Sequence, residues 1–513
     1  MILVLALLAA QQPALPADLD GYVAKVMQTF EVPGLSLAVV KDGKVLLARG
    51  YGVRRMGDPA PVDGKTQFGI ASNTKIFTAT ALALLVEEGK LAWDAPVIRY
   101  LPGFAMYDPF VTRELTIRDL LVHRSGLGLG AGDLLWWPPS SYNRKEIASR
   151  LRYIKPATSF RSAYAYDNVL YAVAGEVIEA VSGLTWENFV ATRILAKVGM
   201  AASDVRHSAA GMAGNVAGTH ARIDGTVRPI APFLSDNTNP AGGIMAGADD
   251  MAKWVMVQLD SGRTADGGRL FSTRTTRELW TIVTPIPIGE PAPELRDLRS
   301  NFNGYALGLG VRDFRGRKML SHTGGLPGYL SRVTMLPELR LGVVVLTNQE
   351  SGNAFNVLTN RILDHFVGAT SPDYLGIAVK AEAAEAARLA KAATTRTAGR
   401  DSSSGPSLPL ARYAGTYRDD WYGDITIAQE GNRLVLRFSR TPSLVGDLSH
   451  WQHDTFVARW RDRELRADAF LTFALNPDGT IERARMMAVS DETDFSFDFQ
   501  DLELKPVRAP TRP

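Results

Sequence analysis

The chain has 513 residues, of which 46% are hydrophobic and 22% charged, an ordinary composition for a globular protein. Its 57 basic and 54 acidic residues leave a formal net charge of +3, and no block of like charges favours binding to nucleic acid or to an acidic membrane surface. Cysteine is absent, which excludes disulfides, thiolate metal sites, a cysteine nucleophile and a lipidated N-terminal cysteine. The length exceeds the size at which one hydrophobic core stops growing, so we expect at least two domains.

The N-terminal segment 1–10 is a short apolar run that ends in small residues before Gln11-Gln12-Pro13. This pattern resembles the apolar region and cleavage site of a secretory signal, although no basic residue precedes the run. We therefore expect a signal peptide over 1–10 and a periplasmic or secreted protein; a disordered or helical tail is the alternative. Apart from a possible uncleaved signal we expect no membrane span, since no other stretch reaches the ~18 apolar residues that a span needs.

Beyond this segment, the apolar pattern first predicts a hairpin over 34–51 around the turn Lys41-Asp42-Gly43-Lys44. Helical spacing follows it over 73–89. The pattern then predicts helices at 166–183, 185–198 and 250–259, and strands at 319–323, 330–336 and 341–347. The first domain is therefore expected to be a sheet built from both ends of the segment around a largely helical middle. The alternation of a parallel, doubly wound sheet is absent from this pattern.

After this domain the composition changes twice. Residues 378–397 are rich in Ala, Glu and Lys and predict a helix, and 398–408 form a Ser/Gly/Pro linker, so 371–408 are expected to connect two domains. Residues 409–510 then show short apolar runs between turn signals, at 424–427, 433–438, 470–475 and 480–487. This spacing predicts a second, smaller all-β domain, an antiparallel barrel.

Ser72 and Lys75 are the first residues with recognisable chemistry. They lie three positions apart where a strand-like segment gives way to a helix, so their side chains share one helix face. A serine hydroxyl is a poor nucleophile near neutral pH and needs a base, while a lysine becomes a base only when its surroundings lower its pKa. The helix start also offers the N–H of Ser72 to a developing oxyanion. The pair alone fits equally well a helix cap beside a solvated charge.

Two later segments carry residues that suit the same chemistry. Tyr166 and Asn168 stand at the start of a long amphipathic helix, where both can face a cleft and the tyrosine can exchange protons with Lys75. The segment Ser321-His322-Thr323-Gly324-Gly325 ends a predicted strand, and its glycines allow a substrate to approach the backbone. The N–H of Gly325 is then a candidate second oxyanion donor. A capping turn with a core tyrosine, and a strand end with a surface histidine, are the alternatives.

Five ordered segments resemble the class C β-lactamase and penicillin-binding-protein-like serine hydrolases, a group that includes D-aminopeptidases and related esterases. They are GIASNTKIFTATAL, DLLVHRSGL, YAYDNVLYAVAGEVIE, NPAGGIMAGADDMAKW and LSHTGGLPGYLSRVTMLPE. The resemblance runs from about residue 19 to residue 367 and implies an α/β (α+β) transpeptidase fold over 17–370. That fold is an antiparallel sheet with helices on both faces plus a helical subdomain. The C-terminal part resembles the lipocalin-like barrel attached to some members, which covers the active-site mouth or helps assembly.

The resemblance also implies roles for the residues that match the family motifs. Ser72 is expected to form the acyl-enzyme, Lys75 to activate it, and Tyr166 to act as general acid and base. Asn168 is expected to orient Lys75 and the substrate amide. The strand end from His322 to Gly325 is expected to bind substrate.

His322 stands where many members have the lysine of a Lys-Thr-Gly triplet. A lysine is a permanent cation for a substrate carboxylate, whereas a histidine is charged only in part near neutral pH, so carboxylate binding is expected to weaken as pH rises. The His-x-Gly version resembles the peptidase members more than the true β-lactamases. The tryptophans of the segment 133–137 suggest a lid or pocket wall, and we predict substrate binding for Trp136, with plain packing as the alternative.

We therefore predict a serine hydrolase that cleaves an amide or ester bond through an acyl-serine, with a peptidase acting on D-amino-acid-containing peptides as the leading hypothesis. A carboxylesterase, a weak β-lactamase and a non-catalytic penicillin-binding receptor or scaffold are the alternatives. The expected partner is a small-molecule or peptide substrate. No cofactor and no metal are expected, since the seven histidines show no metal-ligand spacing.

Overall fold

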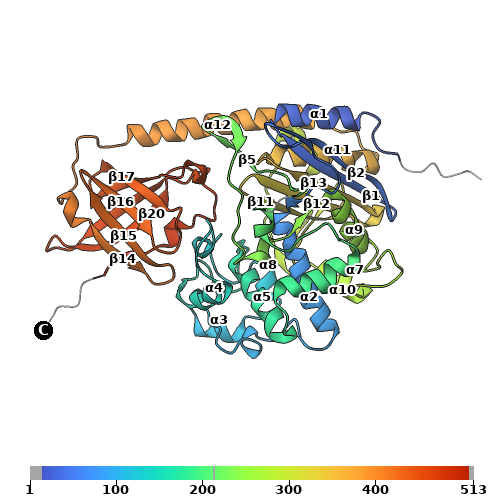
Figure 1. Cartoon of the computed structure of the whole chain (residues 1–513), viewed down its shortest axis with the longest axis horizontal. Coiled ribbons are helices and arrows are strands. Elements are labelled where there is room, and N and C mark those ends of the chain that lie inside the picture. The colour runs from blue at the N-terminus through green and yellow to red at the C-terminus, as the bar shows by residue number, and fades with distance from the viewer. Residues whose placement is uncertain (1–13, 212–213, 508–513) are drawn as a thin grey trace, which may run out of the picture.

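The computed structural model describes residues 14–211 and 214–507, which form two domains joined by the long helix α12, Tyr374–Ala398 (Figure 1). The helix begins four residues before the predicted 378–397 and covers most of the way between the domains. The predicted signal peptide at 1–10 lies outside the described residues, as does the end of the predicted barrel range, 508–510.

The first domain is built on a nine-stranded antiparallel sheet in the order β3-β2-β1-β13-β12-β11-β10-β9-β8. Its strands are β1 Gly34–Lys41, β2 Lys44–Arg55, β3 Asp58–Pro61, β8 Thr284–Pro285, β9 Asn303–Tyr305, β10 Gly310–Phe314, β11 Arg317–Leu326, β12 Tyr329–Leu336 and β13 Leu341–Thr347. The predicted hairpin is confirmed as β1 and β2, and the three predicted later strands as β11, β12 and β13. The N-terminal strand β1 pairs with β13, so both ends of the domain meet in the middle of the sheet.

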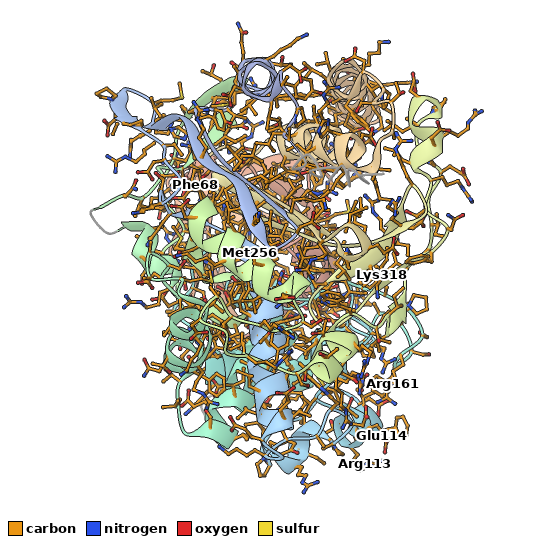
Figure 2. All side chains as sticks on the ribbon, turned by 90° about the vertical axis from the view of Figure 1, so that its right-hand side faces the viewer. Phe68, Arg113, Glu114, Arg161, Met256 and Lys318 are labelled. Carbon is orange, nitrogen blue, oxygen red and sulfur yellow. The ribbon has the colours of Figure 1, made fainter. Side chains whose placement is uncertain are left out.

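The central strand β1 is buried on both faces, and its side chains alternate between two cores. Leu35, Leu37 and Val39 pack with helices α1, Leu19–Thr29, and α11, Gly352–Val367. Ala38 and Val40 belong to the main core on the other face, which α9, Ala248–Leu259, covers. Figure 2 shows α9, marked by Met256, lying across the sheet. This period of two explains why an apolar run with little polar interruption forms a strand here.

The helical middle of the domain packs beneath the sheet around α2, Lys75–Glu87, and α5, Val169–Ser182. The other helices of this part are α3 Pro109–Glu114, α4 Arg144–Arg150, α6 Trp186–Val190, α7 Ala196–Val198, α8 Asn239–Gly242 and α10 Thr273–Leu279. The single helix predicted over 185–198 is instead α6 and α7 with a π-helical turn between them at Ala191–Leu195. Two short strand pairs complete the domain: β4 Phe68–Gly69 with β7 Met245–Ala246, and β5 His220–Ile223 with β6 Thr226–Pro229.

The second domain is an eight-stranded antiparallel sheet in the order β20-β19-β18-β17-β16-β15-β14-β21, which confirms the predicted barrel. Its strands are β14 Gly415–Asp419, β15 Gly423–Glu430, β16 Arg433–Phe438, β17 Val445–Gln452, β18 Thr455–Trp460, β19 Ala469–Leu475, β20 Ile481–Ala488 and β21 Lys505–Pro506. Ala484 of β20 and Leu504, next to β21, exchange both backbone hydrogen bonds, at 2.8 and 3.0 Å. The sheet is therefore nearly closed, which leaves little unpaired strand edge.

The barrel is docked on the first domain through several contacts, and in Figure 1 it stands beside α4. At one place, Arg150 donates from Nη1 to the carbonyl of Trp421 at 2.7 Å, and Arg440 forms an ion pair with Glu146 at 2.8 Å. At another, Arg466 pairs with Glu350, which follows β13, at 2.6 Å. The main apolar cluster runs through both domains.

The described residues include no single helix that is long and apolar enough to cross a membrane. Helix α5 and the segment Trp186–Val198 are long and apolar enough for a span only when they are taken together, and the two are bent by 74° relative to each other.

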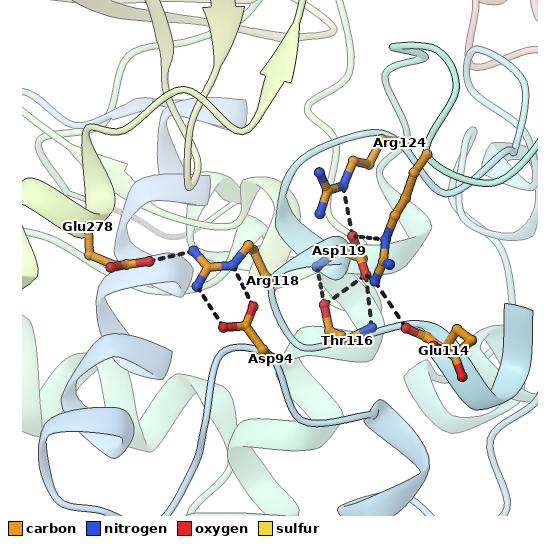
Figure 3. A network of polar contacts seen from close by, with 8 residues as sticks. Asp94, Glu114, Thr116, Arg118, Asp119, Arg124 and Glu278 are labelled. Carbon is orange, nitrogen blue, oxygen red and sulfur yellow. Dashed lines mark hydrogen bonds and ion pairs between the residues drawn. The ribbon is translucent and has the colours of Figure 1, made fainter.

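A polar network braces the loop that follows α3 (Figure 3). The Asp119 side chain is fully buried and accepts hydrogen bonds from Arg124 at 2.8 Å, from Arg161 at 2.5 Å and from the Thr116 hydroxyl at 2.7 Å. Burial alone would raise the pKa of Asp119, but the hydrogen bonds outweigh this effect and the pKa is lowered. The ionised carboxylate therefore stabilises this loop.

We predict that Asp119→Asn lowers the free energy of unfolding by roughly 2–4 kcal/mol near neutral pH, because it leaves two arginines without their buried partner. Unfolded Asp119 has a pKa near 4, above the folded value, so its contribution is complete above that pH and is lost as the pH falls through the folded pKa. Urea denaturation at about pH 7 and about pH 3 should show the wild-type advantage shrinking at the lower pH. Asp94→Asn, which changes an exposed carboxylate paired with Arg118, is the control and should cost under ~1 kcal/mol. Equal costs for the two variants would contradict this account.

Candidate active site

Ser72 lies in a short 3-10 helix, Ala71–Thr74, which leads directly into α2. This turn is held on the sheet by Ser331 of β12, whose hydroxyl donates to the Ile70 carbonyl at 2.6 Å and accepts from Asn73 Nδ2 at 2.8 Å. Ser72 itself is half-buried and so stays accessible.

Gly324 of β11 makes this close packing possible. A Cβ at this position would lie 2.2 Å from the Ile70 carbonyl oxygen and 2.5 Å from Ser331 Oγ, distances that real Cβ atoms essentially never show. The missing side chain therefore lets the strand approach the turn that carries the nucleophile.

Lys75 is fully buried, and its Nζ has three oxygen partners. They are Asn168 Oδ1 at 2.7 Å, the Ala241 carbonyl at 3.0 Å and Ser72 Oγ at 3.0 Å. Two of these are carbonyl oxygens, which only accept hydrogen bonds. A neutral lysine has two N–H groups and one lone pair, so both N–H groups are used by the carbonyls and the lone pair faces the Ser72 hydroxyl. This is the arrangement that a base needs in order to take the serine proton.

The electrostatics agree with this geometry. Burial lowers the pKa of Lys75 to about 7, although the negative charges of Asp133 and Asp167 oppose that change. A substantial fraction of Lys75 is therefore neutral near physiological pH, unlike an exposed lysine.

Tyr166 lies over Lys75, with Nζ 4.9 Å from the ring centroid. Burial raises the pKa of Tyr166 well above its ordinary value, and a hydrogen bond with Ser72 only partly opposes the rise. Tyr166 is therefore a neutral phenol that reaches the nucleophile and has a proton to donate.

The end of β11 presents alternate residues to opposite sides. Thr323 and Gly325 are exposed, whereas His322 and Gly324 are buried, as a strand of period two requires. The exposed pair is therefore the part of this segment that a substrate can contact directly.

His322 was expected to be partly charged and to bind a substrate carboxylate, but its surroundings in the structure do not favour a charge. Its Nε2 is 2.7 Å from the Tyr305 hydroxyl and its Nδ1 is 2.6 Å from the Thr323 carbonyl, so both ring nitrogens have partners inside the protein. Burial and, to a smaller extent, the nearby charge of Lys75 lower the pKa of His322 to about 3. The ring is therefore neutral near physiological pH.

Asp133 connects Asn168 to the rest of the structure. Its Oδ2 accepts from Asn168 Nδ2 at 2.8 Å and from the Ser496 hydroxyl at 2.8 Å, and its Oδ1 accepts from Trp136 Nε1 at 2.8 Å. No motif in the sequence indicates the contact with Ser496, because that residue lies 363 positions from Asp133.

His123, in one of the matching segments, is fully buried beneath the site. Its ring contacts the rings of Tyr164, Tyr166, Tyr171 and Tyr305. Burial lowers the pKa of His123 well below its usual value, and its Nδ1 accepts from the Asp167 N–H at 3.2 Å. A neutral histidine thus packs against the Tyr166 ring, with centroids 4.3 Å apart, a contact that the sequence did not suggest.

Trp136 was predicted to bind substrate, but it does not line the cavity between the two domains. It is 6% exposed and its indole N–H is used by Asp133. Its neighbour Trp137 instead lines a cavity of about 1090 Å³ between the two domains, together with Phe233, Gly325 and Phe497. Of the tryptophan pair, Trp137 faces this cavity and Trp136 does not.

The structure thus brings together all the predicted catalytic residues. Ser72, Lys75 and Asn168 are joined by direct hydrogen bonds, and Tyr166 reaches Ser72. Among the described residues no group of three or more histidine, aspartate or glutamate side chains is placed to hold a metal ion.

Comparison with known proteins gives matches over both domains. The beta-lactamase family model matches residues 19–366, and a model for a domain of unknown function (DUF3471) matches 399–506. The unguisins hydrolase ungD of Aspergillus violaceofuscus is 26% identical over 458 residues, covering 83% of this chain and 79% of the relative.

Two solved structures share the fold. The octameric penicillin-binding protein homologue from Pyrococcus abyssi has a TM-score of 0.60 at 22% identity and covers 95% of this chain and 99% of its own. A class C beta-lactamase mutant has a TM-score of 0.55 at 20% identity, over 67% of this chain and 96% of its own. The predicted transpeptidase fold with a second barrel domain is confirmed.

We predict that the rate at which Ser72 reacts with a fluorophosphonate probe rises with pH around a midpoint near 7, because Lys75 must lose its proton before it can accept that of Ser72. The measurement is the labelling rate constant from about pH 5 to about pH 9. Lys75→Arg is the control, since its guanidinium stays protonated and should label slowly without a rising limb. A wild-type rate that is independent of pH would show that Lys75 is not the base.

Proposed function

Because the chain belongs to the beta-lactamase family, we propose that it is a serine hydrolase that cleaves peptides containing D-amino acids through an acyl-serine intermediate. The observation that carries the proposal is the buried Lys75, whose Nζ contacts Ser72 Oγ at 3.0 Å and two carbonyl oxygens. When the amine is neutral, the two carbonyls take both of its N–H groups, and its lone pair is left for the Ser72 hydroxyl.

In the acylation step, Lys75 takes the proton of Ser72 as Oγ attacks the substrate carbonyl carbon. The oxyanion is held by the N–H groups of Ser72 and Gly325, which lies at the exposed strand end. Tyr166 donates its proton to the departing amine, the carbon–nitrogen bond breaks, and Lys75 returns the proton to Tyr166. The products are an ester on Ser72 and a free amine.

Deacylation reverses the proton path with water in place of the amine. The proton of the water passes to Tyr166 or Lys75 as its oxygen attacks the ester, and Ser72 leaves with a proton returned to Oγ. A single set of groups serves both half-reactions, as microscopic reversibility favours for acyl transfer.

A peptide substrate is favoured by the space next to Gly325. The cavity of about 1090 Å³ lies at the upper end of the size range of small-molecule sites, so it accommodates more than a short-chain ester. Its walls include the aromatic side chains Trp137, Phe233 and Phe497 and come from both domains. The similarity to a relative named as a hydrolase of unguisins also supports hydrolysis.

The neutral His322 argues against efficient hydrolysis of penicillins. The resembling β-lactamases present a lysine cation at this position, whereas here the side chain is buried and uncharged near physiological pH. Preference for D-residues rests on the resemblance to D-aminopeptidase-like members. Esterase and weak β-lactamase activity are the alternatives within the same chemistry.

We predict that Ser72→Ala abolishes both turnover and labelling by a fluorophosphonate or fluorescent penicillin, a loss of several orders of magnitude in kcat. Ser331→Ala, which keeps the nucleophile but loses the hydroxyl that holds its turn, should reduce the rate far less. Turnover by Ser72→Ala at the wild-type rate would refute the mechanism. A single burst of labelling without steady-state turnover by the wild type would favour a receptor.

A second prediction concerns the substrate. The kcat/KM values should rank D-amino-acid-containing oligopeptides above nitrophenyl acetate and nitrocefin, because only the peptides fill the cavity. The same peptides with L-residues provide the stereochemical control. Trp137→Ala should raise KM for peptides and leave that for the acetate ester unchanged. A ranking led by nitrocefin would contradict the peptidase assignment.

A further inference from the structure

A loop of the C-terminal barrel lies against the segment that carries Asp133. The loop follows β20 and holds Phe495, Ser496 and Asp498, of which Ser496 and Asp498 are 3% and 0% exposed. Phe495 packs edge-on against Tyr166, with ring centroids 6.1 Å apart. The barrel therefore contributes side chains to the immediate surroundings of the catalytic residues.

Ser496 is one of three donors that fix the Asp133 carboxylate. It shares Oδ2 with the Asn168 amide, while Trp136 donates to Oδ1. A carboxylate held in this way accepts only the NH2 side of the Asn168 amide, so the amide oxygen is turned toward Lys75. With the amide reversed, an N–H group would face the Lys75 amine, and one of the two acceptors that direct its lone pair would be lost.

Asp498 accepts hydrogen bonds from the backbone on both sides of Asp133. The short helix Asp133–Leu135 follows Gly132, which has no side chain with which to cap it. Asp498 accepts from the N–H of Gly132 at 2.6 Å and from that of Leu134 at 3.0 Å, on either side of Asp133. The second domain thus supplies a cap that the local sequence lacks.

We propose that Ser496 and Asp498 are positioning residues for acyl transfer, which hold Asp133 and, through Asn168, orient Lys75 toward Ser72. This inference rests on the proposed function, because it assigns a role in the same acyl-transfer step. The barrel then belongs to the catalytic apparatus as well as to the wall of the substrate cavity.

The proposal predicts a specific electrostatic change when the Ser496 hydroxyl is removed. Burial raises the pKa of Asp133 to about 7, and its hydrogen bonds, including that from Ser496, oppose the rise. Without the Ser496 hydroxyl, the pKa of Asp133 rises, so Asp133 is protonated over more of the neutral pH range. A protonated Asp133 carries no charge, and the pKa of Lys75 is therefore lower in the variant. The other titratable groups near Lys75 are Asp167, Tyr166, Tyr171, His123, His207 and His322, and Asp498 faces Asp133; the substitution leaves all of these side chains in place. A less charged Asp133 also raises the pKa of Tyr166 less, but burial still keeps the phenol neutral.

The experiment measures fluorophosphonate labelling of Ser72 in the full chain as a function of pH. For Ser496→Ala we expect a rate about tenfold lower at neutral pH and a rising limb displaced to lower pH. Ser496→Thr, which keeps a hydroxyl, should recover most of the rate. Ser449→Ala, the same change at an exposed position of β17 in the same barrel, is the matched control and should behave as wild type.

A double-mutant cycle tests whether Ser496 acts through Asp133. In an Asp133→Asn background, Ser496→Ala should change the rate by less than about twofold, because the carboxylate through which Ser496 acts on Asn168 and Lys75 is already absent. Asp498→Asn should likewise lower the rate with little change in KM for a peptide substrate.

Four outcomes decide the matter. The proposal is supported if the rising limb of the pH profile of Ser496→Ala lies at lower pH than that of the wild type and the double-mutant cycle shows coupling between Ser496 and Asp133. Wild-type behaviour of Ser496→Ala overturns it and leaves the proposed function intact. A lower rate with an unmoved limb and a lower Tm also overturns it, since that result shows a purely structural contact. Labelling of Ser72→Ala at the wild-type rate would overturn the proposed function and this inference together.

Discussion

The burial of the Lys75 amine is the constraint on which the rest of the site depends. A charged amine in the interior is costly, so the surrounding structure must both lower its pKa and give its N–H groups acceptors. Those acceptors come from Asn168 at the start of α5 and from Ala241 in α8, which are remote from Lys75 in sequence. The helical middle of the domain thus supplies two acceptors to this nitrogen atom, and Ser72 Oγ is its third partner.

Much of the architecture could be predicted from local patterns. The hairpin at 34–51, the strands at 319–323, 330–336 and 341–347 and the barrel were predictable from alternation and turn residues, whereas the short strands β3 to β10 were not. Ser72, Lys75 and Asn168 were readable from ordered motifs, and the structure joins them by hydrogen bonds. These features depend on neighbours in sequence or on spacing within one helix, which is information that a single chain carries.

Other features depend on contacts that no local pattern records. His322 was expected to carry part of a positive charge, but the fold buries it against Tyr305 and the charge is lost. Trp136 and Trp137 are adjacent and alike in the sequence, but in the structure Trp136 donates to the buried Asp133 and Trp137 lines the cavity between the domains. Ser496 reaches Asp133 from another domain. In each case the environment created by distant segments sets the chemistry of the side chain.

The glycine at position 324 has a consequence for how this site can diversify. Its missing Cβ sets the separation between the strand and the turn that carries Ser72, so that position has almost no freedom to vary. The neighbouring positions Thr323 and Gly325 are exposed, and Gly325 lines the cavity between the domains. New side chains can therefore arise on the exposed side of β11 and select different substrates, while the spacing of the acyl-transfer groups is inherited unchanged.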